Sequence, residues 1–135
     1  MTIDDLRQFG ARYAAAWSSH NAASVASFFS ENGSLKVNDA EPAVGRAAIM
    51  VSVQGFMTAF PDLQVAMDKL SLEGDEAIFG WTLTGTNTGP GGAGRPVRIS
   101  GYEQWMIGRD GLVAKSLGHF DAADYQRQLH GGTGT

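Results

Sequence analysis

The sequence predicts an α+β domain in which helices come first and antiparallel strands follow. Up to Pro61 the apolar residues recur at spacings of three and four, as on one face of a helix, whereas from Leu63 they alternate with polar residues, as in a half-buried strand. This order is typical of helices packed on one face of an antiparallel sheet. The 135 residues are 43% hydrophobic and 18% charged, which suits one globular core. We therefore expect a single domain over residues 1–135, with a frayed, disordered tail at about 131–135.

The N-terminal helix is predicted from its cap and from its apolar face. Thr2 is a favourable N-cap, and Asp4 and Asp5 place negative charge at the positive end of the helix dipole. The helix should end near Ser19. Its apolar side chains recur at helical spacing: Ile3, Leu6, Tyr13, Ala14 and Trp17.

Two more helices and a short strand are expected before the chain turns to strands. Asn21 caps a short second helix, which residues 31–33 end. A strand at 34–38 follows. The third helix starts after Gly45 and ends before Pro61, because the residue preceding a proline is pushed out of the α region.

The second half of the chain is predicted to be strands with a final helix. The strand that begins at Leu63 changes phase at residues 69–72, as a β-bulge would cause. Residues 73–76 form a hairpin turn, and residues 87–96 a loop rich in glycine and proline. The remaining elements are strands at 77–86, 97–107 and 112–121 and a helix at about 122–129.

Composition and charge argue against several classes of function. Ten Lys and Arg against 14 Asp and Glu give a net charge of -4 with no basic block, so nucleic-acid binding is not expected. The absence of Cys excludes thiolate zinc sites and a Cys nucleophile, and the three His are far apart, so no metal site is expected. The acidic N-terminus and the lack of a long apolar stretch predict no signal peptide and no membrane span, hence a cytoplasmic protein.

Residues 89–94 match the dinucleotide fingerprint G-x-G-x-x-G. That fingerprint binds a pyrophosphate only where it opens a helix, whereas residues 95–97 lead into a predicted strand. We expect a flexible loop and no dinucleotide cofactor.

Glu103 is the first candidate for chemistry. Its predicted strand places it on one face with Val, Ile and Trp side chains. Ionising a carboxyl group there is costly, so its pKa should rise, which suits a neutral acid that donates a hydrogen bond to a developing enolate oxygen. The structural alternatives are an ion pair with Arg98 or Lys115 and a carboxylate at a dimer interface.

His119 and Asp121 form a second candidate pair at the end of the last strand. Two residues apart, they share a face, and because Val113 and Leu117 share it too, we expect it to point inward. A carboxylate beside an imidazole could abstract a proton from carbon. The alternatives are that Asp121 caps the helix that follows and that His119 is a hydrogen-bonded interior residue.

Aromatic side chains supply the third set of candidates. Tyr13 and Trp17 lie one helical turn apart, and a buried Tyr hydroxyl needs a partner, so Tyr13 could donate to a carbonyl or carboxyl oxygen at a cavity. Plain core packing is the alternative for each. The expected apolar walls of a ligand cavity are Trp17, Phe56, Met57, Phe60, Trp81 and Trp105.

Four short motifs occur in a suggestive order and spacing. They are Phe60-Pro61-Asp62-Leu63, the run at 81–89 (Trp-Thr-Leu-Thr-Gly-Thr-Asn-Thr-Gly), the turn at 110–113, and Phe120-Asp121 with Gln128-Leu129. Together, from about residue 13 to residue 129, they resemble the SnoaL-like polyketide cyclase family. That family belongs to the nuclear-transport-factor-2-like superfamily, which also contains ketosteroid isomerases and limonene epoxide hydrolase.

The resemblance implies a cone: a strongly bent antiparallel sheet wrapped around the N-terminal helices, a cystatin-like α+β barrel, with an apolar cavity and a homodimer formed through the outer sheet face. It implies that Asp121 is the acid/base of an intramolecular aldol closure that needs no cofactor or metal. It also puts Tyr13 and Glu103 at the positions of the isomerase oxyanion hole, an arrangement known from ketosteroid isomerase. The isomerase base region, here residues 35–38, has no carboxylate, which argues against a steroid-isomerase mechanism.

The predicted function is a cofactor-independent enzyme that acts on a small apolar carbonyl compound, as a cyclase or a related isomerase. Asp121 would take a proton α to the carbonyl with support from His119, and Glu103 and Tyr13 would stabilise the enolate. The alternative is a non-catalytic module of the same fold that binds a small ligand or assembles as a dimer.

Overall fold

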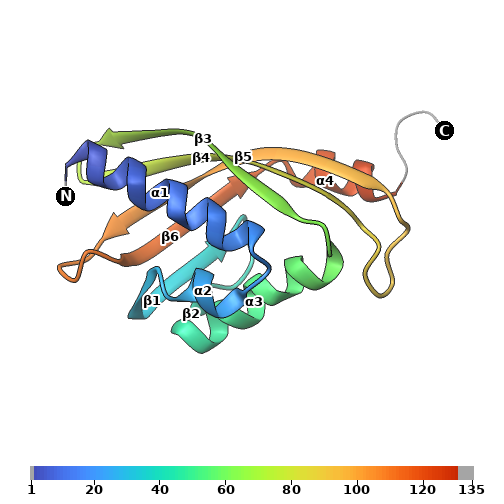
Figure 1. The fold of residues 1–135 in the computed structure, drawn as a ribbon, viewed down its shortest axis with the longest axis horizontal. Coiled ribbons are helices and arrows are strands. Elements are labelled where there is room, and N and C mark those ends of the chain that lie inside the picture. The colour runs from blue at the N-terminus through green and yellow to red at the C-terminus, as the bar shows by residue number, and fades with distance from the viewer. Residues whose placement is uncertain (1, 131–135) are drawn as a thin grey trace.

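The computed structural model describes residues 2–130 and contains the predicted succession of helices and strands (Figure 1). The helices are α1 (Ile3–Ser18), α2 (Ala22–Ala26), α3 (Arg46–Ala59) and α4 (Ala122–Leu129). The strands are β1 (Phe29–Val37), β2 (Ala43–Val44), β3 (Gln64–Glu73), β4 (Glu76–Thr86), β5 (Pro96–Ile107) and β6 (Val113–Phe120). The tail expected to fray, at residues 131–135, lies outside the described residues.

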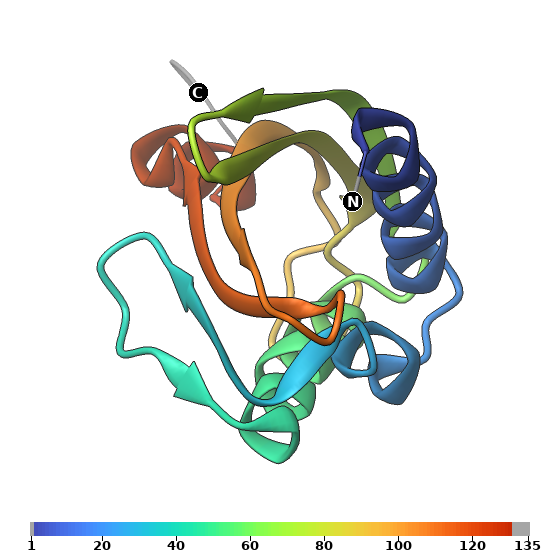
Figure 2. The ribbon, with the colours of Figure 1, turned by 90° about the vertical axis from the view of Figure 1, so that its left-hand side faces the viewer.

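The strands form one six-stranded sheet in the order β2-β1-β6-β5-β4-β3. Figure 2 shows it as a curved, unclosed wall with the helices α1, α2 and α3 gathered along the open side. This confirms the predicted α+β fold with a bent sheet around N-terminal helices. One pair differs from the expectation, because β1 and β6 run parallel while the other pairs are antiparallel.

The first half of the chain departs from the prediction at β1 and β2. The second helix ends at Ala26 and β1 begins at Phe29, five residues before the expected strand, because Phe29 pairs with Val113 of β6. The two-residue strand β2 was not predicted, and it is held only by its pairing with β1. In both places a partner strand supplies the backbone hydrogen bonds, so the residues of the segment itself do not reveal the element.

Two bulges set which side chains face the interior. The register of β3 on β4 shifts between Met67 and Lys69, close to where the change of phase was predicted. A second bulge in β6 was not predicted: Ile107 faces Val113 while Met106 faces Lys115, so Ala114 is an extra residue in β6. Because one inserted residue turns every later side chain to the opposite face, the second bulge decides what β6 presents to the interior.

The consequence for β6 is that its inner face is not the predicted one. Ser116 is completely buried, and Gly118 and Phe120 point inward with it, whereas Leu117 and His119 lie half-buried on the other face. The expectation that His119 shares an inward face with Val113 is therefore wrong. It counted alternate residues across a position where the alternation is broken.

Aromatic side chains pack α1 against the inside of the sheet. Tyr13 and Trp105 are fully buried, and their rings meet edge to face at 5.2 Å. Phe79 of β4 stacks on Trp105 at 4.8 Å. At Gly10 a Cβ atom would lie 2.7 Å from the sulfur of Met67, so a side chain at residue 10 would displace that of Met67.

The loop between β4 and β5 is tied to the end of α3. The Gly89 N–H donates to the carbonyl of Ala59 at 3.2 Å, and a Cβ at residue 89 would collide with the backbone of Thr58. The loop leads into β5 at Pro96, so its glycine pattern opens a strand and not a helix.

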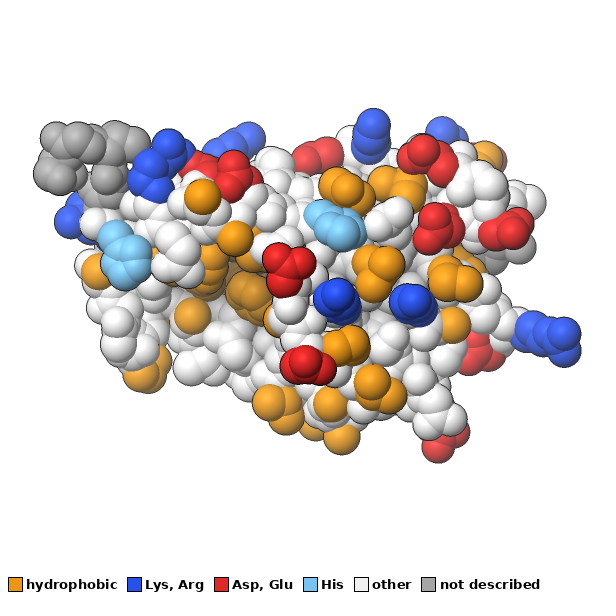
Figure 3. Space-filling view, turned by 180° about the vertical axis from the view of Figure 1, so that it is seen from behind, with side chains coloured by type: hydrophobic (Ala, Val, Ile, Leu, Met, Phe, Trp, Pro, Cys, Tyr) orange, Lys and Arg blue, Asp and Glu red, His pale blue; other side chains and the backbone are white. Residues whose placement is uncertain are grey.

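The face in Figure 3 shows hydrophobic side chains interspersed with charged and histidine side chains. Between residues 2 and 130, no helix is long and apolar enough to cross a membrane.

Candidate functional site

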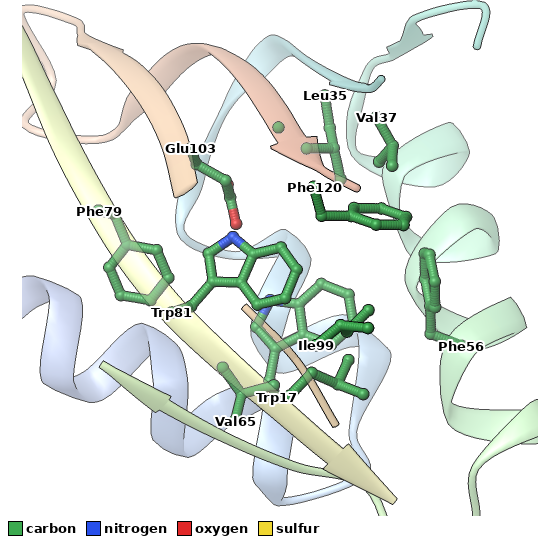
Figure 4. Close-up of a pocket in the computed structure, with 12 residues that line it drawn as sticks. Trp17, Leu35, Val37, Phe56, Val65, Phe79, Trp81, Ile99, Glu103 and Phe120 are labelled. Atoms are coloured by element: carbon green, nitrogen blue, oxygen red, sulfur yellow. The ribbon is translucent and has the colours of Figure 1, made fainter. Parts of the chain in front are cut away.

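An apolar cavity lies inside the curved sheet, with a volume of about 60 Å³ (Figure 4). Its walls come from α1, α3 and five of the strands. They are Trp17, Leu35, Val37, Phe56, Val65, Phe79, Trp81, Leu83, Ile99, Glu103, Gly118 and Phe120. Of these described lining residues, Glu103 alone carries a titratable side chain. A single carboxyl group in an apolar pocket is a combination that often marks a functional site.

Glu103 lies on β5, facing inward as the strand pattern predicts, and is only 7% exposed. Three side chains donate hydrogen bonds to its carboxyl group. The Ser116 hydroxyl donates to Oε1 at 2.6 Å and the Trp105 indole N–H to the same oxygen at 2.9 Å. The Tyr13 hydroxyl lies 3.2 Å from both Oε1 and Oε2. The predicted ion pairs of Glu103 with Arg98 or Lys115 do not form.

Burial controls the protonation of this cluster. Removal from water raises the pKa of Glu103, and the hydrogen bonds from Ser116, Trp105 and Tyr13 offset only part of that rise. Burial, together with the adjacent Glu103 charge, raises the pKa of Tyr13 well above its ordinary value. Tyr13 is thus a neutral phenol that donates to Glu103, and Glu103 is a carboxyl group that protonates more readily than an exposed one.

Asp121 directly follows the last residue of β6 and is exposed to water. It is exposed and is the N-cap of α4, where its carboxylate accepts the backbone N–H of Asp124 at 3.0 Å. It does not line the cavity, although the preceding residue, Phe120, does. The alternative role foreseen for Asp121, a helix cap, is the one its contacts display.

His119 lies on the outer face of the sheet. Its Nε2 is 2.9 Å from Oε1 of Gln104, and its ring lies 4.9 Å from that of Tyr102. Tyr102 and Gln104 are on the face of β5 opposite Glu103. His119 therefore contacts neither Glu103 nor the cavity, and the expected partnership between His119 and Asp121 has no direct contact to support it.

The aromatic residues expected as walls divide into two groups. Trp17, Phe56 and Trp81 line the cavity. Met57, Phe60 and Trp105 are buried in the core and do not line it. Trp105 nevertheless contacts the site, because its indole N–H donates a hydrogen bond to Oε1 of Glu103.

Sequence reasoning missed Ser116, which donates to Glu103, and eight of the residues that line the cavity. The eight are Leu35, Val37, Val65, Phe79, Leu83, Ile99, Gly118 and Phe120. Strict alternation from Val113 put Ser116 and Phe120 on the outer face of the last strand, and the bulge at Ala114 reverses that assignment. A weak signal was available: Phe120 is a large apolar residue, which favours the inner face. Nothing local marks Ser116. Across residues 2–130 no group of three His, Asp or Glu side chains is arranged to hold a metal ion.

Comparison with known proteins agrees with this fold. The model of the family described as SnoaL-like polyketide cyclase matches residues 7–129. The chain belongs to this family. A search of curated proteins finds no match.

Solved structures of the same fold include three informative relatives. TsrD from Streptomyces laurentii is 20% identical, with a TM-score of 0.80 over 96% of this chain and 97% of its own. A hypothetical protein from Catenulispora acidiphila DSM 44928 has a ketosteroid isomerase-like fold and was solved in complex with trimethylamine; it is 15% identical, with a TM-score of 0.79 over 91% of this chain and 92% of its own. SalBIII, an epoxide hydrolase/cyclase-like enzyme of pyran ring formation in the polyether salinomycin, is 16% identical, with a TM-score of 0.76 over 90% and 94%. At these identities the likeness shows the fold alone.

Proposed function

We propose that this SnoaL-like protein is a cofactor-independent enzyme that moves a proton on a small apolar carbonyl compound held in the cavity. Ring closure by intramolecular aldol addition and a double-bond shift are both outcomes of that chemistry. The observation that supports the proposal is the Glu103 carboxyl group, the one titratable side chain among the described residues that line an otherwise apolar cavity. Family membership and the similarity of the fold to SalBIII add to it.

Glu103 is the group we propose for proton transfer. Its raised pKa brings it closer to neutral pH, where a carboxyl group both accepts and returns protons efficiently. The ionised form takes the proton α to the carbonyl while the electron pair of the C–H bond moves into an enolate. The protonated form then donates a proton to carbon or to oxygen; in D₂O the carboxyl group first exchanges its proton with solvent, so the compound gains deuterium. The apolar walls exclude water and so strengthen each of these interactions.

Asp121 as the base remains a separate prediction, which the family resemblance implies. To act in the cavity its carboxylate would have to leave the N–H of Asp124, which it accepts at 3.0 Å. The small cavity volume of about 60 Å³ favours a compact substrate, since that is room for several water molecules or one small ring. A larger substrate requires side chains such as Phe56 and Phe120 to turn aside.

Deuterium exchange tests the proposal and separates the two carboxylates. The protein is incubated in D₂O with a panel of small cyclic and acyclic ketones, and α-carbon exchange is followed by NMR. We expect exchange above buffer that falls about 100-fold or more in Glu103→Gln and less than two-fold in Asp121→Asn. The reverse order would assign the base to Asp121. Absence of exchange for every ketone contradicts the enzymatic proposal.

A second candidate function is binding of a small alkylammonium ion without catalysis. Trp17, Phe56, Phe79, Trp81 and Phe120 supply aromatic walls, and aromatic faces together with a carboxylate attract quaternary and tertiary ammonium groups. The trimethylamine complex of the Catenulispora acidiphila relative favours this candidate. Calorimetry with tetramethylammonium and with the uncharged tert-butyl alcohol tests it. Binding of the cation alone, weakened in Glu103→Gln, is the expected result, and equal binding of both ligands or of neither contradicts it.

The proposal also includes a cytoplasmic homodimer formed through the outer face of the sheet. Tyr102 and Met106, on the outer face of β5, are 43% and 48% exposed. Exposed apolar side chains on a sheet face favour association. Sedimentation of the wild type and of Tyr102→Glu tests it: a dimer that the variant converts to monomer supports the interface, and a monomeric wild type contradicts it.

A further inference from the structure

The two oxygens of the Glu103 carboxyl group accept different numbers of hydrogen bonds. Oε1 is contacted by three donors, from Ser116 at 2.6 Å, Trp105 at 2.9 Å and Tyr13 at 3.2 Å. Among residues 2–130, Tyr13 is the one donor to Oε2, at 3.2 Å. A protonated oxygen is a weaker acceptor than an ionised one, and an indole N–H can only donate. A proton on Oε1 would therefore weaken the hydrogen bonds that this oxygen accepts, so the proton is favoured on Oε2.

The bulge in β6 is what brings a hydroxyl group to Oε1. Because Ala114 is the extra residue, Ser116 turns inward opposite β5. Ser116 is completely buried, and its hydroxyl donates to Oε1 of Glu103. Without the bulge, Lys115 would stand opposite Trp105 in place of Ser116. Ser116 would then lie on the outer face of β6 and could not donate to Oε1.

We propose that Ser116 and Trp105 are positioning residues that fix the Glu103 carboxyl group, so that Oε2 is the oxygen that exchanges the proton with the ligand. This inference rests on the proposed role of Glu103 in proton transfer. In the forward step Oε2 accepts the proton of the α-carbon, the C–H bond breaks, and its electron pair forms the enolate. In the return step the O–H bond at Oε2 breaks and its proton goes to the ligand. While Oε2 is protonated, that proton exchanges with solvent, so in D₂O the ligand gains a deuteron and no reactant other than water is needed.

The surroundings of Glu103 simplify a pH test of this inference. Tyr13 of α1 is the titratable group in contact with it, and Ser116 of β6 and Trp105 of β5 are neutral donors. Phe79 of β4 and the other cavity walls carry no charge. Because a donor to the ionised form lowers the pKa of a carboxyl group, the removal of either neutral donor should raise the pKa of Glu103.

The experiment compares Ser116→Ala, Trp105→Phe and the control Ser100→Ala, whose hydroxyl lies on the exposed side of β5, 2.7 Å from that of Thr82. The pKa of Glu103 is read from the ¹³C shift of its carboxyl carbon in labelled, full-length protein. We expect the pKa to rise in both test variants and to stay unchanged in Ser100→Ala. In the ketone assay we expect Ser116→Ala to lose about ten-fold in exchange at neutral pH, with the pH profile displaced in the same direction as the pKa. Ser116→Thr, which keeps the hydroxyl, should restore both.

The NMR titration decides the positioning role independently of activity. An unchanged Glu103 pKa in folded Ser116→Ala and Trp105→Phe overturns the inference, even if the wild type exchanges ketone protons. If the Glu103 pKa rises in the two variants but the wild type exchanges no ketone protons, the hydrogen bonds to Oε1 are supported and the proposed function is contradicted. If Ser116→Ala fails to fold, Trp105→Phe, which also removes a donor to Oε1, carries the comparison with Ser100→Ala.

Discussion

Two carboxylates at neighbouring strands of one sheet have opposite environments. Glu103 is buried on the inner face of β5, receives three side-chain donors and has a raised pKa. Asp121 follows the end of β6, is exposed, and accepts a backbone N–H as the cap of α4. The chemistry available to a carboxyl group in this protein therefore depends on whether it is buried inside the sheet and on which groups donate hydrogen bonds to it.

The comparison also separates two ways of binding a carboxylate. At α4 the charge is satisfied by a backbone donor in water, and the gain is stability of a short helix. At Glu103 the carboxyl group is removed from water and partly compensated by side-chain donors, which costs stability. Substitutions near Glu103 and at Asp121 can therefore be tested separately.

Filling the cavity beside Glu103 should have the largest effect. A Cβ atom at Gly118 would meet the Lys36 carbonyl oxygen at 3.4 Å and Cγ of Glu103 at 3.7 Å, which are ordinary contacts. We expect Gly118→Val to fold but to reduce ketone exchange, and binding of any cavity ligand, about 100-fold, because its methyl groups occupy the ligand's space. Thermal unfolding checks the fold, and Ala123→Val on exposed α4 is the control. Full activity in folded Gly118→Val would show that the ligand lies elsewhere.

Removal of the Tyr13 hydroxyl should reduce ketone exchange less than filling the cavity does. Tyr13→Phe keeps the aromatic packing against Trp105 and deletes one donor to the carboxyl group. We expect the pKa of Glu103 to rise, since this hydrogen bond lowers it, and ketone exchange to fall about ten-fold. Carboxyl ¹³C titration measures the first effect and the exchange assay the second. The related change Tyr125→Phe, away from Glu103, should alter neither; a fall in both variants would point to a general packing effect.

The raised pKa of the buried Glu103 carboxyl group should make the stability of the protein depend on pH. The folded-state pKa of Glu103 is raised above its ordinary value of 4.5, so its contribution is fully present below pH 4.5 and is lost as pH rises through the folded-state pKa. We expect the free energy of unfolding of Glu103→Gln relative to wild type to improve as pH increases through that window. Urea unfolding of both proteins across pH 4 to 8 measures it. A difference that is constant with pH would mean that Glu103 ionises as an exposed residue does.

The smallest effects should come from Asp121. Asp121→Ala removes the cap of α4 and should cost about 1 kcal/mol of stability, whereas Asp121→Asn keeps a capping oxygen and should cost a few tenths of that. Urea unfolding at neutral pH distinguishes them. A large activity loss in Asp121→Asn with unchanged stability would reverse the contrast, because capping would then not be the residue's main role.

Local sequence predicted those parts of the fold that a few neighbouring residues decide. The cap at Thr2, the turn at residues 73–76 and the helix at 122–129 follow from hydrogen bonds and spacings within one turn of chain. Glu103 was also found, because β5 keeps its alternation unbroken along β4 and the neighbours of Glu103 on that face are apolar.

Residues whose position depends on a partner strand could not be found in this way. Ser116 and Phe120 reach the interior only because β6 bulges at Ala114 against β5, and Phe29 enters β1 only because β6 lies parallel beside it. The amino-acid sequence by itself thus determined the α+β class, most element bounds and one buried carboxyl group. The tertiary structure decided the strand order, the donors to Glu103 and the exposure of Asp121, since pairing across a sheet depends on residues far apart in the chain.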